Sequence, residues 1–273
     1  MKSLTLLPEG GLGNRMAAVA SAAAYCRERD IPLRVVWTRA WGMAARYADL
    51  FEAAPAGVEI CEAGWREKLT LDRPRRRNLW LPRLCQRLLF DRCVYLDEVY
   101  AEPEGKLSLP AGFRAAGDVY LVHLSEFYYR PGMYDALRPA ETVARSIAQR
   151  TAGFDAHTVG LHIRRTDNVC ARRESPLEHF EEAMRRELEA DGRTRFYVAT
   201  DDEPTKRHLL RLFGHERIMT SPEAATRDSV EGIREALVEM YTLARCRRIY
   251  GSAHSSFSIV ACRLGGHDAE WWR

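Results

Sequence analysis

Two adjacent arginines at the end of a predicted strand are the side chains in this sequence best suited to bind an anion. Thr158 to Arg164 has the pattern of a strand, and period-two alternation places His162 and Arg164 on one of its faces. Arg165 follows directly, and guanidinium groups bind phosphate in bidentate fashion and stay charged at every working pH. A structural ion pair with Asp167 is the alternative, but two neighbouring cations favour an anionic ligand.

A glycine-rich turn near the N-terminus is a second candidate for anion binding. The segment Gly10 to Arg15 follows a short apolar strand and opens an alanine-rich stretch with helical spacing. Its glycines, including Gly11 and Gly13, let a ligand approach backbone N–H donors at a helix start. A simple tight turn explains the glycines equally well, but Asn14 and Arg15 favour ligand binding because a turn does not need them.

Two acids follow the predicted apolar strand Arg195 to Thr200. Asp201 and Asp202 are either a metal-binding pair or a helix cap that also contacts ligand hydroxyls, since Pro204 and a helical segment come next. Adjacent side chains on an extended chain point apart, so capping or hydroxyl contact is favoured over a metal site. The sequence therefore predicts no bound metal, and Asp201 remains a ligand-binding candidate.

Small hydroxyl residues follow the predicted strand Arg248 to Gly251. Ser255 and Ser256 stand at the start of a predicted helix, where N–H groups and the helix dipole attract anions. A serine-rich cap is the plainer interpretation, but the segment is richer in hydroxyls than a cap requires. An anion site facing two arginines suggests a diphosphate whose charge is stabilised by protein groups where other enzymes use magnesium.

The elements that position these segments form two successive α/β units. Ser175 is predicted to cap the first long helix of the second unit. The alternation of strands and helices predicts two Rossmann-like lobes, residues 1–150 and 151–273, with parallel sheets facing a cleft. The expected strands are 4–7, 33–37, 119–124, 158–164, 195–200, 217–220 and 248–251, and the expected helices are 16–29, 139–149, 177–190, 205–213, 230–245 and 257–264.

Composition restricts the class of protein. The chain has 273 residues, of which 46% are hydrophobic and 29% charged, and its net charge is +3. These values indicate a globular protein that suits a phosphate-bearing substrate and requires no nucleic-acid partner. Seven cysteines occur singly without a C-x-x-C pair, which favours reduced thiols. Without a signal peptide or a run of about 18 apolar residues, a cytoplasmic location is expected.

The segment from Arg73 to Arg92 combines a cluster of arginines with an amphipathic pattern. A surface helix with its apolar face in the core is the favoured interpretation. The alternative is a helix that makes peripheral contact with an anionic membrane, at its inner face, or with an acidic acceptor.

Four of these segments resemble one known enzyme superfamily. Gly-Gly-Leu-Gly-Asn-Arg, His-x-Arg-Arg-Thr-Asp, a strand ending in Ala-Thr-Asp-Asp, and Gly-Ser-x-x-Ser-Ser-Phe-Ser occur here in the order found in the α1,6/α1,2/protein O-fucosyltransferases. The likeness is greatest to the α1,6-fucosyltransferases, including the rhizobial nodulation enzyme. The resemblance implies a GT-B-like, inverting glycosyltransferase that uses GDP-fucose without a metal or other cofactor, in bacterial glycan biosynthesis. Its acceptor would be a glycan or a lipid-linked glycan.

The resemblance also implies roles for the strand-end residues. Arg164 would hold the β-phosphate and assist its departure, with Arg165 in support. His162 would lie beside the nucleotide, and Ser255 and Ser256 would contact the phosphates.

Two further roles follow from the same resemblance. Asn14 and the neighbouring Gly11 and Gly13 would face the donor from the other lobe. Glu239 stands where the family carries an acid that reads guanine, a role that suits a carboxylate because it accepts from N1–H and the 2-amino group together. An exposed helix acid with no such role is an equally good interpretation of Glu239.

The catalytic base is the position at which the sequence departs from the family. Inversion uses a carboxylate that takes the proton of the acceptor hydroxyl. The α1,6 enzymes carry this acid a few residues after the arginine motif, where this chain has Arg172. Glu174 is the nearest acid and becomes the candidate base, with Glu126 and Asp167 as alternatives.

Other classes of function stay open at this point. The motifs specify a diphosphate better than a sugar, so a glycosyltransferase with another nucleotide-sugar is one alternative. A non-catalytic protein that binds nucleotide-sugar or glycan is a second, and a membrane or interaction protein built around the basic helix is a third. Replacement of Arg164 separates them, because only a transferase loses turnover.

Overall fold

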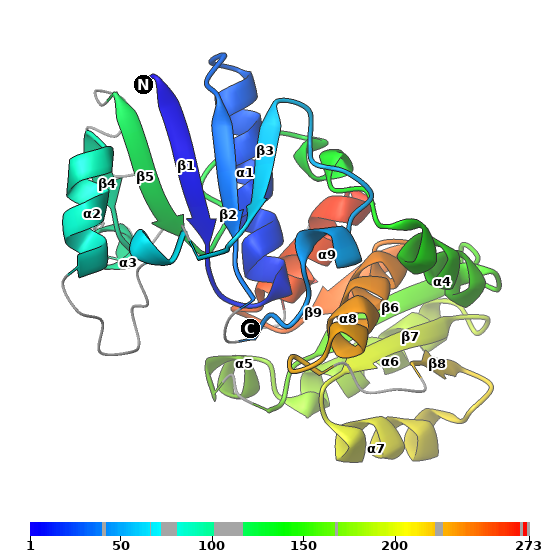
Figure 1. Cartoon of the computed structure of the whole chain (residues 1–273). Helices are drawn as coiled ribbons and strands as arrows, with labels where there is room; N and C mark the ends of the chain where they lie inside the picture. The colour runs from blue at the N-terminus through cyan, green and yellow to red at the C-terminus, as the bar shows by residue number, and fades with distance from the viewer. Residues whose placement is uncertain are drawn as a thin grey trace. The chain divides into compact units, whose positions relative to one another are not determined.

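The chain folds into two compact units, each with its own parallel sheet (Figure 1). The structure is a computed structural model that describes residues 1–39, 42–65, 67–71, 81–100, 117–166, 169–221, 226–267 and 270–271. The units span Met1–Arg138 and Pro139–Arg273. The expected α/β architecture of two Rossmann-like units is confirmed.

The first unit has strand order β3-β2-β1-β5-β4, with all neighbouring strands parallel. Its strands are β1 Ser3–Pro8, β2 Leu33–Trp37, β3 Val58–Glu62, β4 Arg92–Val94 and β5 Asp118–His123. Its helices are α1 Leu12–Arg27, η1 Tyr47–Asp49, η2 Glu67–Leu69, α2 Leu81–Leu89, α3 Leu96–Tyr100 and η4 Met133–Ala136.

Continuous apolar runs place β1 and β5 at the centre of this sheet. Both strands are buried along nearly their whole length, as expected when helices or loops cover both faces of a parallel sheet. α1 packs against β1, and most of its alanines between Ala17 and Ala24 are buried. The glycine-rich turn between β1 and α1 is thereby fixed at the carboxyl edge of the sheet.

The second unit has strand order β10-β9-β6-β7-β8, again with parallel neighbours. Its strands are β6 Thr158–Ile163, β7 Arg195–Thr200, β8 Ile218–Thr220, β9 Arg248–Gly251 and β10 Glu270–Trp271. Its helices are α4 Glu141–Thr151, α5 Val169–Glu174, α6 Leu177–Ala190, α7 Glu203–Phe213, α8 Val230–Leu243 and α9 Ser256–Gly265.

β6 is the central strand of this unit and is buried throughout. One core cluster joins its apolar residues to Phe180 on α6 and Leu209 on α7. α4 packs against α8, where Arg150 makes a two-pronged ion pair with Glu235 at 2.6 and 3.1 Å. α4 therefore belongs to the second unit, which begins at Pro139.

Each sheet has a point at which the strand order reverses. From β1 the chain adds β2 and β3 on one side, and β5 lies on the other side of β1. From β6 it adds β7 and β8 on one side, and β9 lies on the other side of β6. In open α/β sheets, ligands bind at the carboxyl ends of the two strands that flank this point. The segments that follow β1, β5, β6 and β9 are therefore the expected positions of a ligand site.

One local prediction about the second unit is wrong. Ser175 does not cap α6, because Pro176 occupies the N-cap position of that helix. The Ser175 hydroxyl instead accepts a hydrogen bond of 2.9 Å from the Ala253 N–H. A contact across 78 residues thus replaces the local cap, and it ties the start of α6 to the loop between β9 and α9.

Candidate functional site

Arg164 lies at the reversal point of the second sheet, directly after β6. Its guanidinium makes an ion pair of 2.9 Å with Asp201, which directly follows β7. Ile163 and Thr200 are register partners on these parallel strands, so the residue after each strand meets the residue after the other. The Arg164 side chain is 18% exposed, which leaves part of a positioned cation open to solvent.

Asp201 organises the loop that carries both arginines. Its carboxylate accepts from the backbone N–H of Arg165 at 2.7 Å and from that of Thr166 at 3.3 Å. The Thr166 hydroxyl adds a third hydrogen bond. Burial opposes ionisation of Asp201, but the hydrogen bonds and the charge of Arg164 prevail and lower its pKa. Asp201 is thus a fixed anion that sets the position of Arg164.

Arg165 points to a different environment. Its guanidinium donates to the carbonyl of Ser175 at 2.9 Å and lies 6.0 Å from the ring centre of Phe180. Burial lowers its pKa. The two arginines therefore separate, with Arg164 at the strand edge and Arg165 packed under α6.

The neighbouring strand end, after β9, is tied to the same loop. The hydroxyl of Ser252 accepts from the Arg164 backbone N–H at 2.9 Å and donates to the His162 carbonyl at 3.1 Å. The hydroxyl of Ser175 holds the next residue, Ala253. The backbone around Arg164 is consequently held from β7 and from β9.

α9 begins immediately beyond this contact. Ser255 is its N-cap residue, and its hydroxyl makes no capping hydrogen bond. Ser256 is the first residue of the helix, where backbone N–H groups lack helical acceptors. The start of α9 therefore offers N–H donors and two hydroxyls at the edge that carries Arg164, a combination that suits an anion.

His162 supports this arrangement from within the core. Its Nδ1 lies 2.7 Å from the Ser258 hydroxyl, and its ring stacks on Phe257 with centroids 4.5 Å apart. Burial, assisted by the charge of Arg164, lowers its pKa to about 3. A neutral, buried imidazole of this kind fixes α9 against β6.

Glu174, the predicted base, is paired with His254. The distance from His254 Nε2 to Glu174 Oε2 is 2.8 Å, and this hydrogen bond is the main cause of the lowered pKa of Glu174. His254 has a φ of +55°, a left-handed conformation that is uncommon for residues other than glycine. Glu174 ends α5 and His254 precedes α9, so the pair connects the segments that follow β6 and β9.

Glu239 is the most unusual carboxylate of the second unit. It lies on α8 and is buried, and burial, followed by the charge of Glu235, raises its pKa to about 8. Arg150 and Lys206 act in the opposite direction. Among the described residues, no side chain or backbone group donates a hydrogen bond to the Glu239 carboxylate. A buried acid in this state is a common feature of binding sites.

In the first unit, Arg15 holds the glycine-rich turn. Its guanidinium donates to the carbonyls of Gly10 at 2.9 Å and Thr38 at 2.7 Å, and it lies 5.3 Å from the ring centre of Trp37. Burial lowers its pKa to about 10. In this structure Arg15 binds the protein backbone and joins the turn to the end of β2.

The rest of this turn is open. Gly10 needs to be glycine, because its φ is +80° and a Cβ there would meet the Asn14 amide at 2.3 Å. Gly11 is the N-cap of α1, and no atom lies within 4 Å of the place a Cβ would take. Gly13 is buried within α1. Asn14 is half-buried, and its amide lies beside the turn.

His123 ends β5, across the reversal point from this turn. It is fully buried, its Nδ1 lies near the backbone of Ser125, and burial lowers its pKa to about 4. Within the described residues its Nε2 has no hydrogen-bond partner. Glu126, an alternative base in the sequence, accepts a hydrogen bond of 3.0 Å from Tyr134.

The structure thus brings Arg164, Asp201, Ser255 and Ser256 to one sheet edge, with Glu174 beside them. Asp167 lies outside the described residues. Asp202 caps α7 by accepting from the Thr205 N–H at 2.9 Å, which confirms the capping interpretation. Across the described ranges, no three His, Cys, Asp or Glu side chains are grouped as metal ligands.

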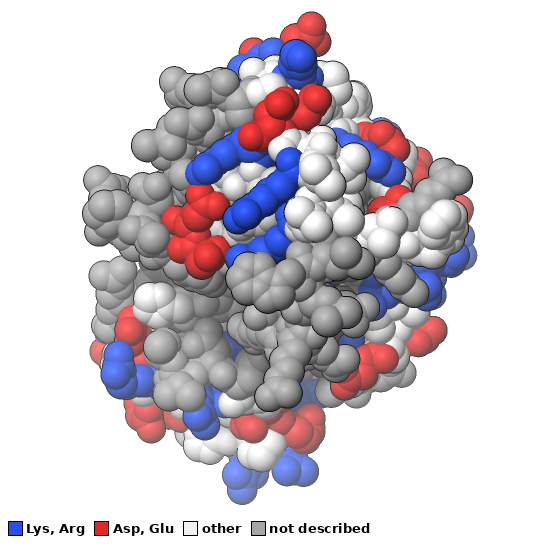
Figure 2. Space-filling view, turned by 60° about the vertical axis from the view of Figure 1, so that its left-hand side comes forward, with Lys and Arg blue, Asp and Glu red and all other residues white. Residues whose placement is uncertain are grey.

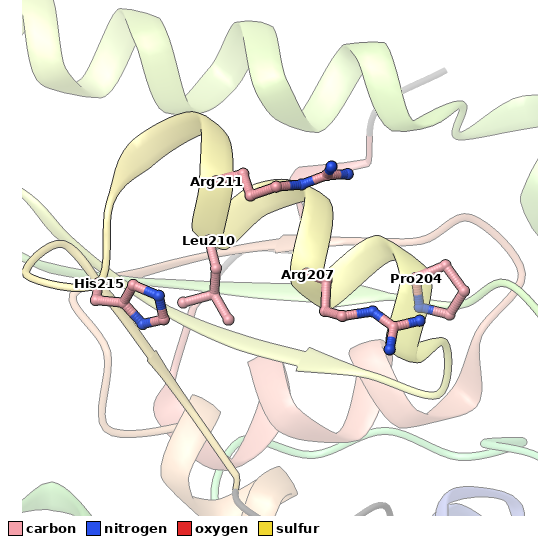
Figure 3. Close-up of a pocket in the computed structure, with 5 residues that line it drawn as sticks. All are labelled: Pro204, Arg207, Leu210, Arg211 and His215. Carbon is pink, nitrogen blue, oxygen red and sulfur yellow. The ribbon is translucent and has the colours of Figure 1, made fainter.

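A separate hollow lies along α7 (Figure 3). None of the predicted site residues lines it, so it is distinct from the strand edge that carries Arg164. Its lining residues are Pro204, Arg207, Leu210, Arg211 and His215.

Sequence reasoning missed three residues that shape the site. Ser252, His254 and Ser175 each bind a neighbouring segment, and each lies within or beside a motif that the sequence analysis singled out. A lone histidine between glycine and serines was the available signal for His254. No local pattern indicates that Ser175 and Ser252 bind backbone N–H groups far away in the sequence.

Comparison with solved structures identifies the fold. NodZ α-1,6-fucosyltransferase, a Bradyrhizobium protein solved after soaking with GDP-fucose, superposes with a TM-score of 0.64 at 18% identity, covering 97% of this chain and 93% of NodZ. The fold is that of the GT-B fucosyltransferases. This likeness agrees with the family resemblance of the sequence motifs.

Two further structures share the fold. A mutant of Arabidopsis thaliana FUT1 in complex with GDP has a TM-score of 0.60 at 15% identity, covering 99% of this chain and 70% of FUT1. POFUT1 in complex with GDP has a TM-score of 0.58 at 12% identity, covering 99% of this chain and 98% of POFUT1. No family model and no curated protein matches the sequence.

Proposed function

We propose that this protein is an inverting glycosyltransferase that transfers fucose from GDP-fucose to a hydroxyl of a glycan or lipid-linked glycan acceptor, without a metal. The fold supports the donor assignment, because NodZ was solved with GDP-fucose and POFUT1 with GDP. The observation that carries the proposal is that one unit contains both a positioned cation, Arg164, and a buried acid, Glu239. Guanosine diphosphate contains a group suited to each.

Glu239 is the proposed reader of guanine. Guanine presents N1–H and the 2-amino group side by side, and one carboxylate accepts from both. In the protein alone the raised pKa of about 8 leaves Glu239 largely protonated at neutral pH. Two donors of the base would favour the ionised form, so guanine and the carboxylate stabilise each other.

Arg164, Ser255 and Ser256 are the proposed diphosphate contacts. The reaction forms a bond from the acceptor oxygen to the anomeric carbon of fucose and breaks the bond from that carbon to the diphosphate oxygen. Negative charge grows on the departing diphosphate, and a cation already held by Asp201 stabilises it without reorganisation. Arg165, His162 and Asp201 position the loop and α9.

Glu174 is the proposed base. Its lowered pKa keeps it ionised at neutral pH, which it must be to take the proton of the acceptor hydroxyl. His254 orients the carboxylate through their hydrogen bond. In the first unit, Asn14 and the open backbone at Gly11 are the proposed ligand contacts, with Arg15 holding their turn.

A thermal-shift panel with GDP, UDP, CDP and ADP in EDTA tests the donor assignment. A ligand that binds only the folded state adds about 2.7 kcal/mol of stability at a hundredfold excess over its Kd. We expect stabilisation by GDP in wild type and a much smaller effect in Glu239→Gln. Stabilisation by UDP alone would exclude GDP-fucose, and no stabilisation by any of the four would contradict a nucleotide-sugar enzyme.

A further inference from the structure

α2 in the first unit has a burial pattern opposite to that of an ordinary surface helix. Gln86 is fully buried, whereas Leu84 is 56% exposed, Leu88 78% and Leu89 63%. A helix that packs on a protein core buries its apolar side chains and exposes its polar ones. These three leucines of α2 therefore face away from the core of their own unit.

Polar contacts on the inner side of α2 fix this orientation. Gln86 Nε2 donates to the Thr70 carbonyl at 2.5 Å, and the Tyr95 hydroxyl donates to Gln86 Oε1 at 2.6 Å. Tyr120 on β5 donates to the same Thr70 carbonyl at 3.0 Å. Turning α2 to bury its leucines would break these buried hydrogen bonds and leave their groups unsatisfied. The outward leucines are thus built into the fold.

Most of the large apolar side chains that are exposed lie on this helix or close before it in the sequence. Among the described residues, seven large apolar or aromatic side chains are exposed, and five of them lie between Trp65 and Leu89. η2 packs beside α2, and Leu69 is its last residue. Single exposed apolar residues are ordinary, but a cluster on adjoining segments marks an interaction surface. We name this surface the α2 face, made of Trp65, Leu69, Leu84, Leu88 and Leu89.

The charge next to the α2 face indicates what it binds. Arg83 and Arg87 lie on α2, and the one acid between positions 81 and 92 is Asp91. Arg92 follows α2 and forms an ion pair of 2.5 Å with Glu98. The sequence before α2 adds four arginines between positions 73 and 77. Figure 2 turns this side of the first unit toward the viewer, and in its upper half basic side chains lie beside uncharged and acidic ones. In an anionic membrane surface, leucines suit the acyl-chain boundary and arginines suit the negatively charged headgroups.

We propose that α2 is an interfacial helix that seats this protein on an anionic lipid bilayer. Leu84, Leu88 and Leu89 insert at the boundary between headgroups and acyl chains, and Arg87 binds lipid phosphate. Trp65 occupies the headgroup level that suits an aromatic side chain. No helix among the described residues is long and apolar enough to cross a membrane. The proposal is independent of the nucleotide that the second unit binds.

Vesicle cosedimentation of the full chain tests the proposal. The lipids are pure phosphatidylcholine and phosphatidylcholine mixed with phosphatidylglycerol. We expect wild type to bind the mixed vesicles at least about tenfold more strongly, and to lose this preference as salt screens the charges. Leu84→Glu/Leu88→Glu should abolish binding. Leu212→Glu, at an exposed leucine on α7, is the matched control and should bind as wild type does.

Three outcomes would overturn the proposal. The first is no preference for the mixed vesicles, and the second is equal loss of binding in Leu212→Glu. The third is a dimer in solution that Leu84→Glu/Leu88→Glu dissociates while wild type ignores lipid, which would assign the α2 face to a second copy of the chain. Unchanged thermal melting of each variant shows that folding is intact, because the substituted leucines are exposed.

Discussion

The guanidinium of Arg164 forms an ion pair of 2.9 Å with the carboxylate of Asp201. The same carboxylate accepts a hydrogen bond from the backbone N–H of Arg165, which lies 36 positions before Asp201 in the sequence. The contact arises because β6 and β7 are parallel neighbours whose ends coincide at Ile163 and Thr200. One carboxylate thereby fixes both the backbone and the guanidinium that we propose for the diphosphate.

Replacement of Arg164 should reduce turnover far more than stability. In Arg164→Gln, Asp201 keeps its backbone and Thr166 hydrogen bonds, so the loop retains its shape. A lost contact to developing charge lowers kcat by about 10² to 10³. GDP release from GDP-fucose with acceptor measures the effect.

Arg165→Gln is the matched control for this experiment. Its guanidinium binds the Ser175 carbonyl under α6, so this variant should lose about 1–3 kcal/mol of unfolding free energy. If Arg165→Gln lowered kcat and Arg164→Gln lowered only the unfolding free energy, the roles assigned to the two arginines would be reversed.

Asp201 should make the second unit sensitive to acid. Its folded pKa is lowered, so its contribution to stability is present above the ordinary value near 3.8 and is lost as pH falls through the folded pKa. Asp201→Asn should be less stable than wild type by about 1–3 kcal/mol at neutral pH. Denaturant unfolding of both proteins across pH 2 to 7 measures the difference, which must narrow toward low pH.

The sequence predicted the central elements of both units, but not β3, β4, β10, the short helices α3 and α5, or every partner within the site. α6 and β7 have the predicted bounds because their periodicity is strong and their flanking residues break it. An ion pair with Asp167, which is near in sequence, was the alternative to anion binding, and Asp167 lies outside the described residues. The contact of Arg164 with Asp201 depends on strand order and register, and local sequence contains neither.

The same limit explains Ser175 and Arg15. Ser175 has the right type and position for a cap, yet Ala253 binds its hydroxyl, because the loop after β9 has a backbone donor to satisfy. Arg15 follows a glycine-rich turn that suits an anion, yet the carbonyls of Gly10 and Thr38 bind its guanidinium. The contacts of Arg15 with Thr38 and of Ser175 with Ala253 join segments that only the folded chain brings near.

Glu174 and His254 should control the pH dependence of transfer. The hydrogen bond from His254 lowers the pKa of Glu174, and the base acts only when ionised. In His254→Ala this pKa returns toward its ordinary value, so the acidic limb of the kcat profile should move to higher pH. Glu174→Gln should lose about 10² to 10⁴ in kcat while GDP still stabilises the protein.

The control for Glu174 is Glu182→Gln, at an exposed acid on α6. It should leave both the rate and the pH profile unchanged. An unaltered acidic limb in His254→Ala would remove His254 from the mechanism, and an active Glu174→Gln would return the search for the base to Glu126 and Asp167.

Glu239 should link GDP affinity to pH. With a pKa of about 8 in the free protein, the ionised form that accepts from guanine becomes about tenfold scarcer with each unit below pH 8. GDP affinity should therefore rise from pH 7 to pH 9 in wild type and stay level over that range in Glu239→Gln. Calorimetric titration of GDP into both proteins at each pH measures the affinity.

The same raised pKa predicts that burial of Glu239 lowers the free energy of unfolding at neutral pH. Between the ordinary pKa of 4.5 and about 8, the unfolded chain ionises this acid while the folded chain keeps it protonated, so stability falls as pH rises through that range. Glu239→Gln should therefore be more stable than wild type at pH 7, by on the order of 3 kcal/mol, with the gain vanishing toward pH 4. A glutamine variant that is less stable at pH 7 and still binds GDP with wild-type affinity would show that Glu239 is a structural residue.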